Sequence, residues 1–456
     1  MRVWLAAVVG VCAVPVSGPA VAQDTAPVAL EYRAAQQRLL ERSDAIAASD
    51  ANLRGKAFQA GATRSLGRPE VDVEAQLLDY QKTLYLPFGS LAPVAQAFGI
   101  DDPLRFRRRE TAVRPIVTAT LPLYTGGQMA GVKAGARAQL DQARAERQGA
   151  VDKALLQLAQ AYYGQQLAEQ ALGVRRDVLA GLERHLSDAE KLEREQFISR
   201  AQRLQAQVAR DDAARAFETA VSDLASANAA LAGLLRAPDG VRPLTPLFVD
   251  ARALPPLETF TARALDAHPE IGRLRALEAQ AEAGVTIEES KRRPTLYGFG
   301  QYNFDRRDSL LTDPDWSVGI GLRYKLASGM GRNQAVAAAR QTALQADAGL
   351  REARTQITIG VTGAWNAVEA ARKRFLLLDS ALESAAENLR LQRLSYREQQ
   401  ATSLDVIDAE LGLGRARIQR AQTAHDYVLA LAQLLDFSGE IDALPDYAAR
   451  ADREVR

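Results

Sequence analysis

The sequence has little of the residue types that most metal sites and enzymes depend on. Its 456 residues include a single cysteine, Cys12, and only three histidines. One thiol supports neither an intrachain disulfide nor a cysteine-based metal site. His185, His268 and His425 are too scattered for the spacing of a metal site or of a catalytic triad. We therefore expect no bound metal, no cofactor and no enzymatic activity.

Long apolar runs and an excess of one charge are also absent. Beyond the N-terminus no run of about 18 apolar residues occurs, so the sequence contains no candidate transmembrane helix. A membrane-spanning form would have to use β-strands. The formal net charge is only +1 and the two signs are interspersed, which argues against nucleic acid as a partner.

The first residues have the pattern of a secretory signal peptide. Arg2 precedes the short apolar stretch Val3 to Val16, and Ala20-Val21-Ala22 offers a cleavage site before Gln23. Lipoprotein processing at Cys12 is not expected, because the apolar stretch before it is too short. We therefore predict that residues 1–22 are removed on export.

An internal repeat organises the rest of the chain. Leu123-Tyr-Thr-Gly126 and Leu326-Ala-Ser-Gly329 are 203 residues apart, and the same shift pairs Arg194-Glu-Gln196 with Arg397-Glu-Gln399. Upstream, Arg68-Pro69 and Arg293-Pro294 are 225 residues apart, so the first copy carries about 22 extra residues, in or near Tyr85 to Ala112. Two structural repeats joined by a Pro-rich linker follow from this pattern. The predicted segments are the first repeat (23–236), the linker (237–257), the second repeat (258–437) and a C-terminal tail (438–456).

Each repeat is expected to contain a helix, two strands, a very long helix, a tip and a returning helix. Apolar and polar residues alternate around residues 71–77 and 317–325, as in strands with two unlike faces. Strands of about 10 residues have the length that a tilted strand needs to cross a bilayer. A helix of 67 residues would be about 100 Å long. The expected helices are 28–63, 128–194 and 201–235, with copies at 257–290, 331–397 and 403–435; the two less regular strands are 113–124 and 294–304.

Four strands per chain leave two arrangements open. Four strands cannot close a barrel with an interior, and an open sheet edge in lipid leaves backbone groups unpaired. Either the strands form a soluble sheet, or several chains pool their strands into one barrel that the long helices continue as a tube. The signal peptide and the strand length favour pooling.

The tip between the last two long helices carries two acids. Thr402 and Ser403 can cap the helix that follows, and Asp405 and Asp408 lie three residues apart on one face of it. The acids could form a charged site, or they could only favour the positive end of the helix dipole.

In this order and spacing, the motifs resemble the TolC family of outer-membrane efflux and secretion channels. The resemblance covers nearly the whole mature chain. Its most specific parts are the repeat itself and four segments: Leu121-Pro-Leu-Tyr-Thr-Gly-Gly127, Leu326-Ala-Ser-Gly329, His268-Pro-Glu-Ile271 and Thr402-Ser-Leu-Asp-Val-Ile-Asp-Ala409.

The resemblance implies an α+β membrane channel. Four transmembrane strands per chain would pool into a 12-stranded barrel of a homotrimer, continued by a long coiled-coil tunnel through the periplasm. A small equatorial domain would form from the linker and the tail. The channel would be passive, set in outer-membrane lipid, and would dock onto a periplasmic adaptor and an inner-membrane pump that is proton-driven or of the ABC type.

The resemblance also assigns roles to residues of the tips. Asp405 and Asp408 would form rings of carboxylates at the periplasmic aperture. Tyr396, Arg397 and Gln202 would lie at the gate, where Ala401 and Gln202 replace an arginine and an aspartate of the family. Adaptor contacts would involve Arg194, Glu195, Gln196, Glu398 and Gln399, and the strand-to-helix turns would use Gly126, Gly127 and Gly329.

Three functions remain open from the sequence. The first is export of small molecules, the second is the same duct in type I protein secretion, and the third is a soluble periplasmic coiled-coil protein. The basic residues Arg105, Arg107, Arg108 and Arg109 are expected in a loop that is either merely solvated or touches anionic lipopolysaccharide.

Overall fold

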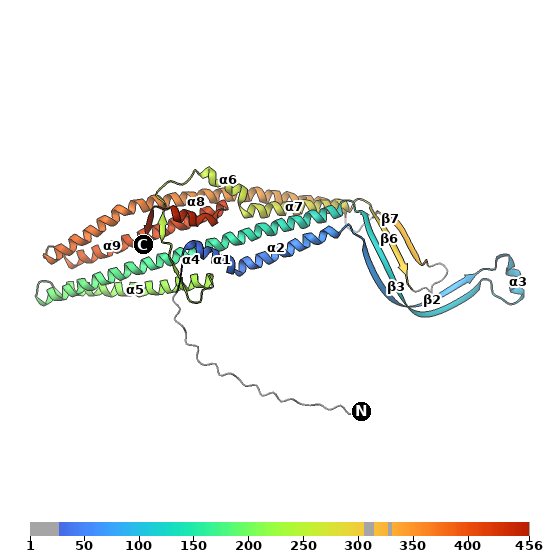
Figure 1. Ribbon diagram of the computed structural model, residues 1–456, viewed down its shortest axis with the longest axis horizontal. Helices are drawn as coiled ribbons and strands as arrows, with labels where there is room; N and C mark the ends of the chain where they lie inside the picture. The colour runs from blue at the N-terminus through green and yellow to red at the C-terminus, as the bar shows by residue number, and fades with distance from the viewer. Residues whose placement is uncertain (1–26, 305–313, 327–330, 456) are drawn as a thin grey trace, which may run out of the picture.

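The computed structural model describes residues 27–304, 314–326 and 331–455. The predicted signal peptide and Gly329 therefore lie outside the described residues. The molecule is elongated: long helices occupy one end and the middle, and strands occupy the other end (Figure 1). None of the described helices is both long enough and apolar enough to cross a membrane.

The first half begins with the short strand β1 (Val28–Leu30) and two helices, α1 (Tyr32–Arg42) and α2 (Asp44–Ala62). The single helix expected over 28–63 was wrong, because Ser43 takes an extended conformation and caps α2, its side chain accepting from the Ile46 amide. The remaining elements of this half are the 3-10 helices η1 (Thr63–Ser65) and η2 (Gly89–Leu91), the strands β2 (Glu70–Leu86) and β3 (Leu104–Tyr124), and the helices α3 (Ala92–Ala97), α4 (Gln128–Arg194) and α5 (Arg200–Leu234).

The second half repeats this order of elements. The helix expected over 257–290 is again two helices, because His268 is extended and caps the second one, with Pro269 at its first position. After the linker strands β4 (Val241–Pro243) and β5 (Leu247–Val249) come α6 (Leu257–Ala267), α7 (Pro269–Ser290), β6 (Thr295–Asn303), β7 (Trp316–Arg323), α8 (Arg332–Arg397) and α9 (Ser403–Ser438), and the chain ends with η3 (Ile441–Ala443), α10 (Leu444–Arg450) and β8 (Arg453–Val455).

The main sheet has four antiparallel strands in the order β2-β3-β6-β7. Directly paired residues share a face, so the register defines rows across the sheet. The rows Val71–Ala119–Gly300–Val318 and Val73–Val117–Tyr302–Trp316 make one face apolar, whereas the row Asp72–Thr118–Gln301–Ser317 lies on the opposite, polar face. Val73 is 76% exposed and Val318 is 74% exposed. In a single chain, the apolar face of the sheet is therefore open to its surroundings.

The β2–β3 hairpin is longer than the sequence predicted. The segment 85–112, expected as an inserted loop, contributes residues to both strands, and Arg105, Arg107, Arg108 and Arg109 lie within β3. Twelve residue pairs, from Ala75–Pro115 to Leu86–Leu104, extend beyond the last pair of β3 with β6. At about 3.3 Å per residue, this two-stranded part is about 40 Å long. It ends in α3, at the opposite end of the molecule from the helical tips (Figure 1).

The buried core lies near the middle of the helical part. β1 pairs with β4, and β5 pairs with β8, so the linker and the C-terminal tail lie together beside the long helices. Tyr162 of α4 fixes this arrangement: its hydroxyl donates to the Leu30 carbonyl at 2.8 Å and accepts from the Leu244 and Thr245 amides. Tyr162 is fully buried, and its ring packs edge-on against that of Tyr32, 5.2 Å away between centroids.

Candidate functional site at the helical tips

The two helical hairpins, α4–α5 and α8–α9, turn at the same end of the molecule (Figure 1). Helices α4 and α8 both end in a Schellman motif, in which an amide beyond the helix donates to a carbonyl of the last turn. The Phe197 amide donates to the Leu192 carbonyl, and the Gln400 amide donates to the Ser395 carbonyl, each at 2.8 Å. The motif requires a left-handed residue just before each donor. Gln196, with φ of 64°, and Gln399, with φ of 61°, supply it where glycine is the usual residue.

The returning helices begin with reciprocal capping boxes. In the first hairpin, the Gln202 side chain accepts from the Ser199 amide, while the Ser199 hydroxyl accepts from the Gln202 amide. In the second hairpin, Asp405 and Thr402 make the same exchange. The capping role expected for Thr402 is thus confirmed.

Asp405 and Asp408 are both exposed on α9, one helical turn apart. Hydrogen bonds from the Thr402 hydroxyl and amide lower the pKa of Asp405, so its carboxyl group is ionised at neutral pH. The neighbouring face of α9, with Leu404, Ile407 and Leu411, borders an apolar groove. The two predicted acids therefore lie beside this groove rather than in it.

Tyr396 and Gln202 are brought together by His185 and Ser403, which the sequence analysis named only as an isolated histidine and as a candidate helix cap. His185 Nε2 lies 2.8 Å from Ser403 Oγ, and the Ser403 hydroxyl lies 3.4 Å from the carbonyl of Gln202. The ring of Tyr396 packs against that of His185, with 4.9 Å between centroids. Ser403 is fully buried and His185 is 6% exposed. Together these four residues, which we call the tip clasp, join the two hairpins.

The tip clasp is built for a neutral histidine. Burial lowers the pKa of His185, and Arg393 lowers it further, while Asp188 and Ser403 oppose the shift. A neutral imidazole can hydrogen-bond the buried hydroxyl without placing a desolvated charge between the helices. The sequence did contain a signal for this site, because His185 interrupts the buried stripe of Val178, Leu182 and Ala189.

A second polar contact lies next to the tip clasp, on the side away from the tips. Arg393 of α8 forms an ion pair with Glu410 of α9, which is 6% exposed. Burial raises the pKa of Glu410, and the arginine opposes that shift. The carboxylate lies against Gly181 of α4, where a Cβ would collide with it. The glycine thus makes room for the buried carboxylate of this partly exposed ion pair between three helices.

The remaining predicted residues lie at the outer surface of the tips. Those expected to contact an adaptor are all exposed: Arg194, Glu195, Gln196, Glu398 and Gln399. Arg397, expected at the gate, is also exposed. Ala401 is half-buried in the second turn. Arg203 of α5 pairs with Glu193 of α4, within the same hairpin, at 2.9 Å. No group of acidic, histidine or cysteine residues that could hold a metal ion occurs in the described parts of the chain.

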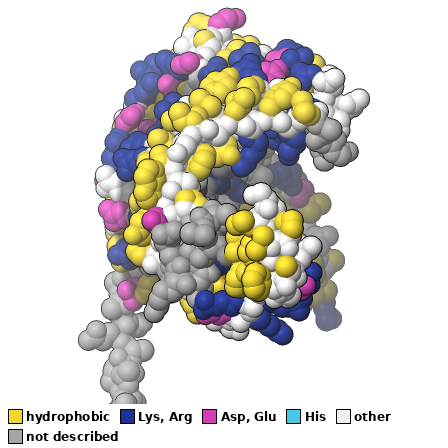
Figure 2. Space-filling model, turned by 90° about the vertical axis from the view of Figure 1, so that its right-hand side faces the viewer, with side chains coloured by type: hydrophobic (Ala, Val, Ile, Leu, Met, Phe, Trp, Pro, Cys, Tyr) yellow, Lys and Arg dark blue, Asp and Glu magenta, His cyan; other side chains and the backbone are white. Residues whose placement is uncertain are grey.

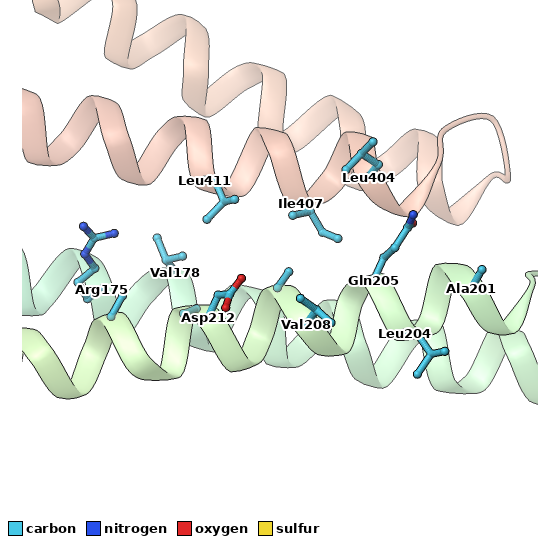
Figure 3. A pocket seen from close by; sticks show the side chains of 13 residues that line it. Arg175, Val178, Ala201, Leu204, Gln205, Val208, Asp212, Leu404, Ile407 and Leu411 are labelled. Atoms are coloured by element: carbon cyan, nitrogen blue, oxygen red, sulfur yellow. The ribbon is translucent and has the colours of Figure 1, made fainter.

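An apolar groove of about 770 Å³ lies between the two hairpins, lined by residues of α4, α5 and α9. Ile407 and Leu411 of α9 point across it toward α5, where Val208 lies on the opposite wall (Figure 3). Val208 is 60% exposed and Leu404 is 50% exposed. A single chain therefore leaves an apolar surface open between its hairpins.

Comparison with known proteins confirms the resemblance to this family of channels. Residues 261–440 match the profile of the family described as outer membrane efflux protein. None of the curated proteins matches the sequence.

Solved structures match over nearly the whole chain and fix the fold. The CmeC outer membrane channel of Campylobacter jejuni superposes with a TM-score of 0.73 at 12% identity, covering 92% of this chain and 89% of CmeC. The outer membrane protein VceC of Vibrio cholerae gives 0.72 at 15% identity, covering 89% and 96%. The open state of the MtrE outer membrane channel of Neisseria gonorrhoeae gives 0.69 at 18%, covering 90% and 89%. The chain thus has the fold of outer membrane channels.

Proposed function

We propose that this protein is the passive outer-membrane exit duct of a tripartite efflux system in a Gram-negative bacterium, and that it carries small molecules across the periplasm and the outer membrane. The observation that carries the proposal is the two-faced sheet. One face is apolar and exposed, the other is polar, and helices of 67 and 66 residues follow β3 and β7 along the chain. A lipid-facing wall with a polar lumen needs this pattern.

A homotrimer would complete the duct. The sheet has two edge strands, β2 and β7, whose unpaired backbone groups would each cost several kcal/mol in lipid. Pairing β7 of one copy with β2 of the next removes both edges, and three copies give twelve strands.

The groove between the hairpins supports the same assembly. A neighbouring copy could fill it with apolar side chains of α8 that a single chain leaves exposed, among them Leu377, which is 74% exposed, Leu391 and Leu394. Helix α8 of the neighbouring copy would then pack against α5 and α9 and close the tunnel wall.

At the tips, threefold symmetry would convert Asp405 and Asp408 into rings of carboxylates around the axis, which would favour cations at the constriction. The exposed residues around Gln196 and Gln399 would contact a periplasmic adaptor, and an inner-membrane pump would supply the energy. The tip clasp would hold the two hairpins of each chain together at this aperture.

Oligomeric state and single-channel conductance of the detergent-purified protein test the proposal together. We expect a trimer that inserts into planar bilayers and conducts ions without an energy source. A mature protein that is extracted without detergent and sediments as a monomer would contradict it and would favour a soluble coiled-coil protein.

A further inference from the structure

The β2–β3 hairpin reverses the polarity of its two faces partway along its length. Up to Leu77 and Val113, the outward face continues the apolar rows of the sheet. Beyond them the same face carries the pairs Gln81–Arg109, Thr83–Arg107 and Tyr85–Arg105. The register has no bulge between the two parts, so the change from apolar to cationic occurs on one continuous surface.

The opposite face changes in the other direction. In the sheet it carries Asp72 and Glu74. Beyond the switch it still carries the charged pair Lys82–Arg108, and its last pairs, Leu84–Phe106 and Leu86–Leu104, are apolar. Near the end of the hairpin, Arg105 and Arg107 thus lie on the outward face and the apolar pairs on the opposite one, a separation that a hairpin extending into water does not need. The arrangement matches surroundings that change from hydrocarbon to something anionic on the outer side.

The position of the switch agrees with the edge of the hydrocarbon layer. The apolar side of β3 runs from Leu123 to Val113, about 33 Å of strand at 3.3 Å per residue. At the tilt of about 40° usual in membrane barrels, this spans about 25 Å, the height of an outward apolar band. Arg109 and Arg107 then lie about 10 and 15 Å beyond the edge along the same face, where long side chains can reach the headgroups.

The charges on this face are largely uncompensated. Arg109 pairs with Asp79 at 2.6 Å. Arg105 lies over the ring of Tyr85, 5.4 Å from its centroid, and within the described residues neither Arg105 nor Arg107 pairs with a carboxylate. Viewed from this end of the molecule, Lys and Arg side chains gather in groups beside the hydrophobic ones (Figure 2). Guanidinium groups bind phosphate oxygens in bidentate fashion.

From this polarity reversal we infer that the outward face of the hairpin, with Arg105, Arg107 and Arg109, binds the phosphate groups of anionic lipid in the outer leaflet. The inference rests on the proposed function, because it requires the sheet to span the membrane. In the trimer, the three hairpins would form a ring of arginines beyond the apolar band. This ring would bind the phosphate groups of the surrounding lipid.

The test compares two variants that each remove two cations from the same hairpin. Arg105→Gln with Arg107→Gln alters the outward face and leaves the Arg109–Asp79 pair intact. Lys82→Gln with Arg108→Gln alters the opposite face, because Lys82 and Arg108 are directly paired there. The probe is fluorescent lipid A, a diphosphorylated glycolipid, titrated into full-length protein in neutral-detergent micelles, with phosphatidylcholine and inorganic phosphate as competitors.

We expect the outward-face variant to bind lipid A about tenfold to thirtyfold more weakly than the unmodified protein, and the opposite-face variant to bind within about twofold of it. Added salt should weaken binding, and neither competitor should displace the probe. Equal affinity of both variants, or displacement by inorganic phosphate at the same phosphate concentration, would overturn the inference. Loss of the trimer in the outward-face variant, measured in the absence of lipid, would also overturn the inference. The outward face would then be a contact between copies rather than a contact with lipid.

Conductance measured on the same preparations separates this inference from the proposed function. A conducting trimer whose outward-face variant still binds lipid A normally refutes only the lipid site. A protein that forms no channel refutes the proposed function, and the lipid site is refuted with it.

Discussion

Asp405 and Asp408 have different surroundings although they lie one turn apart on α9. Asp405 accepts hydrogen bonds from Thr402, whereas Asp408 is exposed. Replacing Asp405 with alanine would remove a helix cap as well as a charge, at a cost of about 1 kcal/mol. Asparagine keeps an acceptor for the cap and removes only the charge, so it isolates the electrostatic role.

We predict that Asp405→Asn with Asp408→Asn weakens block of the channel by multivalent cations about tenfold or more, since one charge contact at 4 Å is worth about 1 kcal/mol even in water. Blocking affinity in planar bilayers measures this. The control is Asp347→Asn with Glu352→Gln, which removes two charges of α8 far from the tips. Unchanged block in the tip variant would remove the carboxylate-ring proposal.

Asp152 of α4 is a buried acid outside the tips. Its Oδ1 accepts from Gln148 at 2.9 Å, while its Oδ2 is buried without a hydrogen-bond partner among the described residues. Burial raises the pKa of Asp152 to about 6, and burial does the same for the pKa of Asp436. Both groups bind protons more tightly in the folded chain than in the unfolded one. Their contribution to stability is therefore full below pH of about 4 and is lost as the pH rises through about 6.

We predict that Asp152→Asn raises the free energy of unfolding at pH 7.5 by about 1 to 2 kcal/mol, because asparagine needs no proton to stay neutral. The gain should shrink toward pH 4, where the aspartic acid is itself protonated. Thermal unfolding followed by helical circular dichroism at both pH values measures it. Asp141→Asn, at an exposed position of the same helix, should have little effect at either pH. An equal gain at both pH values would mean that ionisation of Asp152 is not the cause.

Residue-level prediction from the sequence succeeded where the signal was local. The capping role of Thr402 follows from residues three positions apart. The tip clasp could not be predicted in the same way, because His185 and Ser403 are 218 residues apart, and periodicity reports only that a position is buried.

At the scale of elements, the bounds of α4 and α8 were predicted to within one residue, the end of α9 to within three, and the connections less well. Helix α4 has no proline and a continuous apolar stripe, so its pattern is unambiguous. The break at Ser43 was missed because the apolar pattern continues across it, whereas His268 before Pro269 already has the pattern of a helix start in the sequence. The extension of the β2–β3 hairpin beyond Leu77 and Val113 was missed, because the side that is apolar in the sheet becomes polar there and the arginines resemble those of a solvated loop.

The turn from β3 into α4 depends on Gly126. Its φ is +65°, and a Cβ there would lie 2.8 Å from Arg293 Cβ and 2.9 Å from the Ser290 carbonyl oxygen. The Gly126 carbonyl also accepts from Arg293 at 3.1 Å. This residue thus connects the first strand-to-helix turn to the end of α7, where the second pair of strands begins.

We predict that Gly126→Ala lowers the free energy of unfolding by about 2 to 4 kcal/mol, from the left-handed backbone and the close contacts together. Gly164→Ala is the matched control, because Gly164 lies within α4 and a Cβ added there would have no atom within 4 Å. Helix propensity alone should raise the free energy of unfolding of this variant by about 0.5 to 1 kcal/mol. Thermal unfolding of both variants provides the comparison, and similar melting temperatures would contradict the role of the turn.

At the scale of the whole molecule, the sequence left two arrangements open, a soluble sheet or strands pooled from several chains, and it favoured pooling because four strands cannot enclose a lumen. The fold agrees with that of known outer membrane channels, but the partner surfaces became visible only in three dimensions. The apolar groove draws residues from α4, α5 and α9, which no single stretch of sequence brings together. The two faces of the sheet likewise depend on the register of four strands.

Two neighbouring residues of β7 test which face of the sheet meets lipid. Val318 belongs to the apolar face and Ser317 to the polar one. We predict that Val318→Lys lowers the yield of membrane-inserted trimer, because a lysine facing the bilayer midplane costs about 2 to 4 kcal/mol in each chain, and three chains place three such lysines in one barrel. Ser317→Lys adds the same charge to the lumen, so it should insert normally and shift only ion selectivity. If both variants insert equally well, the apolar face does not contact lipid, and if only Ser317→Lys fails, the two faces are reversed.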